Sequence, residues 1–218
     1  IEGPVNWKYA FERQWLFYKI WGRLLYNPAT PDEIFQAEFT RRYGKAGRNL
    51  LRASSLAGAT PLRLASSFDF GWDFTLYSEG MMALDTRSNP RYVNYISVDR
   101  QIAQPVTDPD YVAVNEYVKT LSAGGSFTKD RITPLNLADL LERDCHQALQ
   151  LVKDINTSGN TALSNALLYE VADIRIWANL GLSFAAKLRG AVALETYRLN
   201  GGETHKQKAV EHLQNTLR

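Results

Sequence analysis

The stretch from residue 161 to residue 200 limits what this chain can fold into more than any other. It contains no proline, and Gly201-Gly202 follow it directly, as glycines do just past the end of a helix. Apolar residues recur along it at intervals of three and four: Leu163, Leu167, Val171, Ile174, Ala178, Gly181, Ala185, Leu188 and Val192. A second stripe runs beside the first: Trp177, Leu180, Phe184, Ala191 and Leu194. Because two apolar stripes indicate two buried faces, we predict a central helix, roughly 60 Å long at 1.5 Å per residue.

Composition excludes several classes of partner. With 218 residues, 45% of them hydrophobic, the chain can bury a sizeable core. Its 25 Lys+Arg nearly balance its 23 Asp+Glu and form no basic stripe, so we expect no nucleic-acid partner. Uncharged apolar runs fall short of the ~20 residues that a spanning helix needs, which predicts a soluble chain with no membrane partner. The chain begins at Ile1 without methionine or a signal segment, which indicates a processed protein or a fragment of a longer one.

The first predicted helix covers residues 6–26 and is rich in aromatic side chains. One stripe at helical spacing comprises Trp7, Phe11, Trp15, Tyr18, Gly22 and Leu25, and it is broadened by Phe17, Trp21 and Leu24. Such a stripe is more typical of core packing than of a ligand platform, and both interpretations are open.

The next predicted helix begins at Thr30-Pro31-Asp32-Glu33, which has the spacing of a capping box between Thr30 and Glu33. Phe35 and Phe39 should face inward. A third helix covers residues 46–57, and Pro61 should break or kink the chain before a restart toward Ser67.

Residues 68–110 form the irregular region of the chain, with short helix expected around 79–85. Glycines and prolines interrupt it, and it places aromatic rings beside carboxylates in FDFGWDFTLYSEG. Such a loop can plug a bundle end or an interface, contact a sugar ring, or do glycosidic acid/base chemistry. The predicted substrate-binding residues are Trp72, Asp73, Tyr77 and Glu79.

Further helices are predicted over residues 111–122, 134–155 and 203–217. Clean alternation of apolar and polar residues is almost absent, which disfavours strands. The predicted fold is therefore all-α, an elongated bundle of about six to eight helices around residues 161–200. We expect a single helical domain over residues 1–218, with 1–67 and 111–218 able to form two lobes joined by 68–110.

No strong catalytic or metal motif is present, so we assign no catalytic residue, no metal ligand and no cofactor. The histidines, at 146, 205 and 212, lack the spacing of a zinc pair. Cys145 is the only cysteine, which excludes an internal disulfide, and it has no activating cluster nearby, so we expect it to pack in a helix. G-x-S-x-G and phosphate-binding glycine loops are absent from the sequence.

The charged residues on the central helix need partners or a cavity. Glu170, Asp173 and Lys187 lie near its second stripe. Ion pairs with Arg13 or Arg23 of the first helix are the favoured interpretation, and a ligand cavity is the alternative.

Four segments together resemble a helical domain of large bacterial glycoside hydrolases, on the C-terminal side of the catalytic barrel, in enzymes of the alpha-glucuronidase and hexosaminidase-like kind. The segments are WLFYKIWGRLLYNPATPDEIFQAEFTRRYG, LRASSLAGATPLRLASSFDF, ITPLNLADLLERDCHQAL and EVADIRIWANLGLSFAAKLRGAVALETYRLNGG.

This resemblance implies carbohydrate processing by a parent enzyme in the periplasm or outside the cell. The catalytic carboxylates of such enzymes lie on the barrel, so the chain would be an accessory domain that braces the barrel and could line its substrate cleft. Its partners would be the adjacent catalytic domain and, through the parent enzyme, carbohydrate. The alternative hypothesis is a stand-alone interaction module with an aromatic docking surface for a protein partner.

Overall fold

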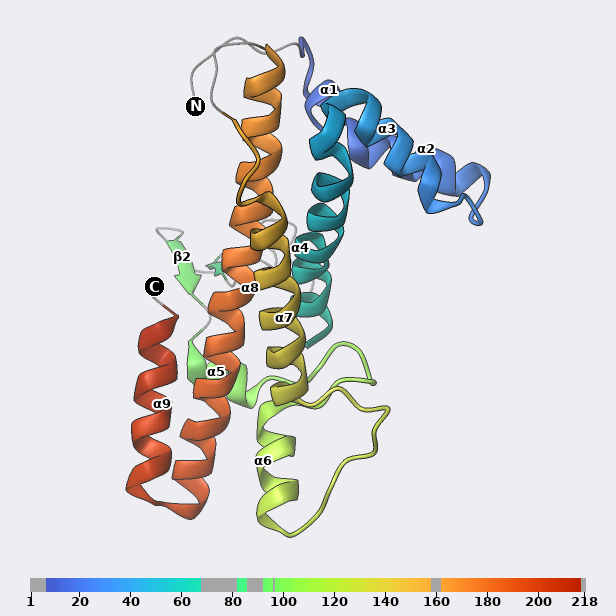
Figure 1. The fold of residues 1–218 in the computed structure, drawn as a ribbon. Helices are drawn as coiled ribbons and strands as arrows, with labels where there is room; N and C mark the ends of the chain where they lie inside the picture. The colour runs from blue at the N-terminus through green and yellow to red at the C-terminus, as the bar shows by residue number, and fades with distance from the viewer. Residues whose placement is uncertain (1–6, 68–81, 86–91, 96, 158–161, 217–218) are drawn as a thin grey trace. The chain divides into compact units, whose positions relative to one another are not determined.

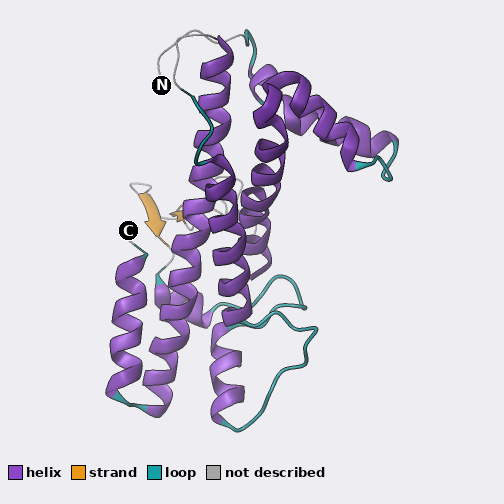
Figure 2. Ribbon diagram, in the orientation of Figure 1, coloured by secondary structure: helices purple, strands orange, loops and turns teal. Residues whose placement is uncertain are grey.

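The computed structural model describes residues 7–67, 82–85, 92–95, 97–157 and 162–216 (Figure 1). Helices make up most of this part of the chain, as Figure 2 shows, and the fold is all-α apart from one short β-hairpin. The chain divides into two compact units, each built from two segments of sequence. Unit 1 comprises Ile1–Leu56 and Gln147–Ile176, and unit 2 comprises Ala57–His146 and Trp177–Arg218.

The long central helix is confirmed. Helix α8 runs from Ala162 to Asn200 without interruption. Most of its predicted stripe is buried, including Val171, Ile174 and Leu188. It ends at Gly201 and Gly202, whose φ angles of 73° and 93° are accessible to glycine at little cost.

Unit 1 contains α1 (Ala10–Arg13), α2 (Trp15–Tyr26), α3 (Asp32–Tyr43), the 3₁₀ turn η1 (Gly44–Ala46) and the first part of α4 (Gly47–Ser67). Phe35 and Phe39 of α3 are buried, as their spacing predicts. The turn from α3 into α4 depends on glycine, because Gly44 has φ of 58° and a side chain at Gly47 would overlap the Phe39 carbonyl.

Two expectations for unit 1 are wrong. The first predicted helix is split at Gln14 into α1 and α2, and α2 has no fully buried residue. The capping box of α3 does not form. Thr30 donates its hydroxyl to the carbonyl of Asn27 at 2.6 Å, in the turn that ends α2, and the residue preceding α3 is Pro31. The hydroxyl is thus used in the preceding turn, where it satisfies a carbonyl at the end of a helix.

Helix α4 continues through Pro61, where the sequence predicts a break or a kink, so the helix is not broken there. Proline has no N–H, so the carbonyl of Ala57 loses its helical donor. The preceding residue, Thr60, is fully buried, and its hydroxyl lies 3.7 Å from the Cys145 sulfur.

Unit 2 contains α5 (Val98–Ala103), α6 (Val114–Ser122), α9 (Glu203–Asn215), the rest of α4 and most of α7 (Pro134–Val152) and α8. Thr133 caps α7 by accepting the Asn136 amide at 3.2 Å, which explains why this helix begins where the sequence predicts. The core gathers buried side chains from α4, α5, α6, α7 and α8: Leu64, Ile102, Val114, Leu137, Ala138, Leu141, Phe184, Ala185, Leu188 and Ala191.

The region predicted to be irregular, 68–110, contains regular elements. Strands β1 (Met82–Asp85) and β2 (Tyr92–Tyr95) pair antiparallel, with Met82 opposite Tyr95, and α5 follows. The strand at Met82–Asp85 overturns the short helix expected over 79–85.

Helix α9 turns back along the end of α8 (Figure 1). The Leu213 side chain packs on Gly190, and Ser183 donates its hydroxyl to the Thr216 carbonyl at 3.0 Å. On α9, Ala209 is buried and Val210 is exposed.

Candidate functional site

The predicted substrate-binding residues Trp72, Asp73, Tyr77 and Glu79 lie outside the described residues. Their contact with a sugar stays a sequence prediction. The candidate sites built below come from the part of the chain that the structure describes.

The charges on α8 in unit 1 form a structural ion cluster. Arg13 pairs with both Asp173 and Glu170, which confirms the interhelical pairing expected from the sequence. The Glu170 carboxylate also accepts the Tyr43 hydroxyl at 2.9 Å and lies 3.4 Å from the Trp15 indole nitrogen. Burial raises the pKa of Glu170, although these donors and Arg13 oppose the shift. Each of these side chains has a partner within the fold, so the cluster supports the packing of α8.

Arg23, the other arginine considered for this cluster, lies near Glu38 instead, at 3.8 Å. Lys187, farther along α8, is half-buried, and burial lowers its pKa to about 8.

Cys145 is a packing residue. Its thiol is fully buried beside Thr60 and Gly181, and burial raises its pKa. A buried thiol with a raised pKa is a poor nucleophile.

Metal and membrane sites receive no support from the described residues. Among them, no group of three His, Cys, Asp or Glu side chains could hold a metal ion. No helix among them is both long enough and apolar enough to cross a bilayer.

The candidate site that does emerge is an exposed aromatic surface on α2, which we call the α2 face. It consists of four side chains that recur at helical spacing with high exposed fractions: Phe17 at 56%, Tyr18 at 51%, Trp21 at 57% and Leu25 at 73%. The rings touch one another, with centroids 5.3 Å apart for Phe17–Trp21 and for Phe17–Tyr18. All four residues belong to the broadened stripe whose spacing favours core packing, so that interpretation is wrong for this part of the stripe.

The α2 face is exposed because the other side of α2 makes its contacts with α3. The Trp15 ring lies 5.0 Å from the Phe39 ring, and the Lys19 ammonium lies 2.8 Å from the Glu38 carboxylate. Hydrophobic residues occur nearly all round α2, and a helix of that kind normally has a second buried face. The sequence therefore shows that α2 is hydrophobic on more than one side. It does not show which side packs against the rest of the chain and which stays exposed.

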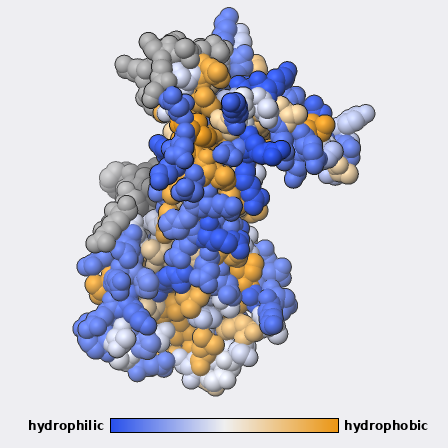
Figure 3. All heavy atoms as spheres, in the orientation of Figure 1, coloured by the Kyte–Doolittle hydropathy of each residue, from blue (hydrophilic) through white to orange (hydrophobic). Residues whose placement is uncertain are grey.

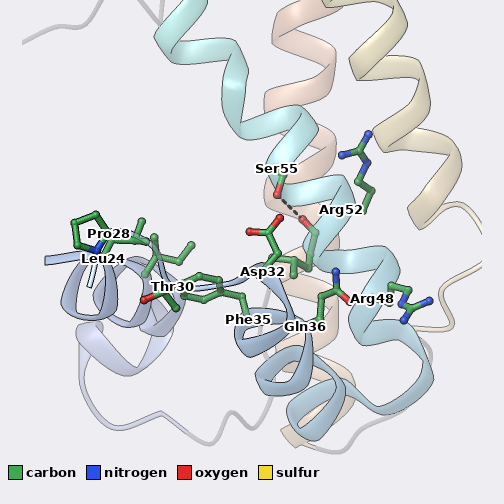
Figure 4. A pocket seen from close by; sticks show the side chains of 11 residues that line it. Leu24, Pro28, Thr30, Asp32, Phe35, Gln36, Arg48, Arg52 and Ser55 are labelled. Atoms are coloured by element: carbon green, nitrogen blue, oxygen red, sulfur yellow. Dashed lines mark hydrogen bonds between the residues drawn. The ribbon is translucent and has the colours of Figure 1, made fainter. Parts of the chain in front are cut away.

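Unit 1 also contains a cavity of about 730 Å³ between α2, α3 and α4 (Figure 4). Leu24 and Phe35 supply apolar walls, and Asp32, Arg48 and Arg52 supply the charges. Figure 4 shows both arginine side chains extending from α4 away from Asp32, so the charged groups do not converge on one point. The cavity lacks the convergent polar groups of a specific ligand site.

A second cavity, of about 440 Å³, lies in unit 2 and is lined by residues of α6, α7, α8 and α9. Four of its side chains are basic: Arg189, His205, Lys208 and His212. The space-filling view in Figure 3 shows hydrophobic side chains gathered toward the ends of α6 and α8, amid a largely hydrophilic surface. This cavity is distinct from the α2 face, which lies in unit 1.

Comparison of the chain with protein-family models, with curated proteins and with solved structures gives no match.

Proposed function

We propose that this chain is a non-catalytic helical domain that docks through its α2 face onto an adjacent catalytic domain of a carbohydrate-active enzyme. The observation that carries the proposal is the exposure of three aromatic rings and a leucine on one face of α2. The sequence resemblance to helical domains of glycoside hydrolases supplies the identity of the partner, a catalytic barrel.

The size of the α2 face suits an interface. A large apolar side chain offers roughly 150–250 Å², so the exposed parts of four such side chains add up to on the order of 400 Å². That is the scale of the largest apolar patches on monomeric proteins, which are often functional. It is about half of the ~800 Å² that each partner contributes to a standard interface. The α2 face would thus form the apolar centre of a larger contact.

The charges beside α2 indicate what the partner surface carries. Glu38 pairs with three cations, Lys19, Arg23 and Arg41, so this ion cluster has a net charge of 3 − 1 = +2. The sequence of α2 itself contains Lys19 and Arg23 and no acidic residue. A partner surface with carboxylates around an apolar centre would complement it, because charged rims steer association and fix orientation.

The first test reads the gene in frame on both sides of the segment that encodes this chain. A barrel-encoding segment in the same frame is expected. A start codon directly before Ile1 together with a stop codon directly after Arg218 would overturn the assignment to a parent hydrolase.

The second test compares hydrogen exchange of residues 15–26 in the isolated chain and in the full gene product. The backbone amides near the α2 face should become more protected in the full product, because the partner limits local opening of the helix. Leu25→Ser should remove much of that added protection. Leu62→Ser is the matched control, since Leu62 is 71% exposed on α4, outside the α2 face.

The alternative function, a stand-alone interaction module, gives a different result. If two copies of this chain pair through the α2 face, sedimentation of the isolated chain should show a dimer that Leu25→Ser dissociates and Leu62→Ser does not. That result, with unchanged exchange in the full product, would replace the proposed partner with a second copy.

A further inference from the structure

We propose that the cavity in unit 2 between α6, α8 and α9, here called the α9 pocket, binds a small organic monocarboxylate with a flat apolar body. This binding site is separate from the docking function proposed for α2. Its volume of about 440 Å³ falls within the usual range for small-molecule sites.

The basic side chains of α9 share one face because of their spacing. His205, Lys208 and His212 are separated by three and four residues, so they lie above one another on the helix and line the same cavity wall. No hydrogen bond or ion pair engages these three side chains within the described part of the chain. In contrast, the neighbouring Lys206 lies 3.4 Å from Glu203 and does not line the pocket.

Arg189 adds a cation from α8. Its guanidinium donates through Nε and one terminal nitrogen to Glu142, and through that same nitrogen to Asp139. The other terminal nitrogen, Nη1, makes no hydrogen bond among the described residues. The two carboxylates fix the orientation of Arg189, and neither of them lines the pocket.

The charges on the pocket wall therefore have one sign. Its lining contains no Asp or Glu among the described residues, while Lys208 supplies one full positive charge and forms no ion pair among them. Because the charge of Arg189 is already offset by Asp139 and Glu142, one uncompensated charge favours a monoanion over a phosphate dianion.

The rest of the lining suits an apolar body with few polar atoms. Val118, Leu121, Leu135 and Val192 provide hydrophobic surface. The polar residues of the lining are engaged with protein groups: Asn200 donates to Ser122 at 2.9 Å, and Thr196 donates to the Val192 carbonyl at 2.7 Å. Tyr117 stacks on Phe127 with 5.8 Å between ring centroids, and its hydroxyl has no partner within the described residues. Burial raises the pKa of Tyr117, so at neutral pH the phenol keeps its proton and can donate it to a carboxylate.

Titration calorimetry with three related probes tests the proposal. Naphthoate is the carboxylate, naphthalenemethanol is the neutral molecule of similar shape, and naphthyl phosphate is the dianion. Naphthoate should bind at least about tenfold more tightly than the alcohol and more tightly than the phosphate. Equal affinity for naphthoate and the alcohol, or no saturable naphthoate binding at millimolar concentrations, would overturn the site.

Two lysine variants on the same helix locate the binding. Lys208→Met should weaken naphthoate binding about fivefold to tenfold, whereas Lys206→Met should change it less than about twofold. Both lysines are exposed, so neither substitution threatens the fold. The imidazole NMR signals of His205 and His212 should shift during the titration. Equal loss of naphthoate affinity in the two variants would contradict binding in the α9 pocket. NMR signal shifts confined to residues of the α2 face would contradict it as well.

Discussion

The sulfur of Cys145 packs directly against the backbone of Gly181. A Cβ added to Gly181 would overlap that sulfur and would lie 2.9 Å from the Thr60 hydroxyl. The three residues belong to α7, α8 and α4, so three helices of unit 2 meet at this point. Close approach of this kind requires glycine on one helix and a small side chain on the next.

Replacing Gly181 should therefore destabilise the protein. Gly181→Ala gains up to about 1 kcal/mol in helix propensity, but the overlap with Cys145 and Thr60 costs about 1–3 kcal/mol. We expect a net loss of about 1 kcal/mol or more in the free energy of unfolding, measured by urea denaturation. Gly58→Ala is the control, because a Cβ there meets no atom within 4 Å on an exposed part of α4. It should stabilise the protein, and a loss for both variants would contradict the packing argument.

Glu170→Gln should change how stability depends on pH. Burial raises the pKa of Glu170 above its ordinary value of 4.5, so there is a pH range in which the folded protein keeps a proton that the unfolded chain has released. The stability of the wild type must then fall as the pH rises through this window. The glutamine variant still accepts the Tyr43 hydroxyl and lacks that fall, so its stability relative to the wild type should rise as the pH increases above about 4.5. Urea denaturation across this range checks the prediction.

The control for that experiment is Glu211→Gln, which alters an exposed carboxylate on α9. Its stability relative to the wild type should vary less with pH. A pH-independent difference for Glu170→Gln would show that the buried carboxylate does not titrate in this way.

The two arginines that bind Asp144 should differ in their contribution to stability. Arg63 is 20% exposed and donates to Asp144 at 2.7 Å, whereas Arg143 is 65% exposed and donates at 2.8 Å. Asp144 itself is buried, so losing the better-buried partner leaves its charge poorly satisfied. Arg63→Ala should cost about 1–3 kcal/mol, and Arg143→Ala less than about 1 kcal/mol. Equal costs would contradict this ranking.

Acid should reduce the cost of Arg63→Ala. Burial by itself would raise the pKa of Asp144, but hydrogen bonds from Arg143 and Arg63 outweigh it, and the pKa is lowered. Because the pKa of Asp144 is lower in the folded protein, its ionised carboxylate adds stability above 3.8, its pKa in the unfolded chain. This stability is lost as the pH falls through the lower pKa of the folded protein. Urea denaturation of the wild type and of Arg63→Ala, at neutral and at strongly acidic pH, measures how the difference between their free energies of unfolding changes with pH.

Gly201→Ala should destabilise the end of α8 through the backbone alone. A Cβ at Gly201 would meet no atom within 4 Å, but the φ angle of 73° is unfavourable for alanine. The expected cost is about 1–2 kcal/mol, and Gly201→Asn should cost less because asparagine adopts this conformation more readily. Thermal or urea denaturation compares the two, and equal losses would mean that the backbone strain is not the cause.

The positions of the helices could largely be predicted because their signals are local. The period of apolar residues gave α8, Thr133-Pro134 gave the start of α7, and Gly201-Gly202 gave the end of α8. Each of these depends on side chains within a few residues of one another.

The failures have a different origin. The capping box at Thr30 failed because the hydroxyl bonded the Asn27 carbonyl instead. Helix α4 also continues through Pro61, although proline removes one backbone hydrogen bond. At Thr30 a competing contact outweighed a local preference worth about 1 kcal/mol.

The candidate sites could be predicted only in part. The sequence identified the Arg13 cluster with Glu170 and Asp173, because buried charges need partners. The α9 pocket was not predicted, since its wall combines α9 with residues of α6 that lie some ninety positions earlier in the chain. The spacing of His205, Lys208 and His212 was visible, but only the fold shows what lies opposite them.

The sequence by itself therefore determined that this chain is an all-α protein built around α8, because apolar periodicity and helix ends depend on neighbours along the chain. Only the tertiary structure decided which side of each helix is covered. Helix α2 has apolar residues on more than one side, and α3 contacts the side with Trp15 and Lys19. Phe17, Tyr18, Trp21 and Leu25 stay exposed because burial is a property of what packs against a face, which periodicity does not specify.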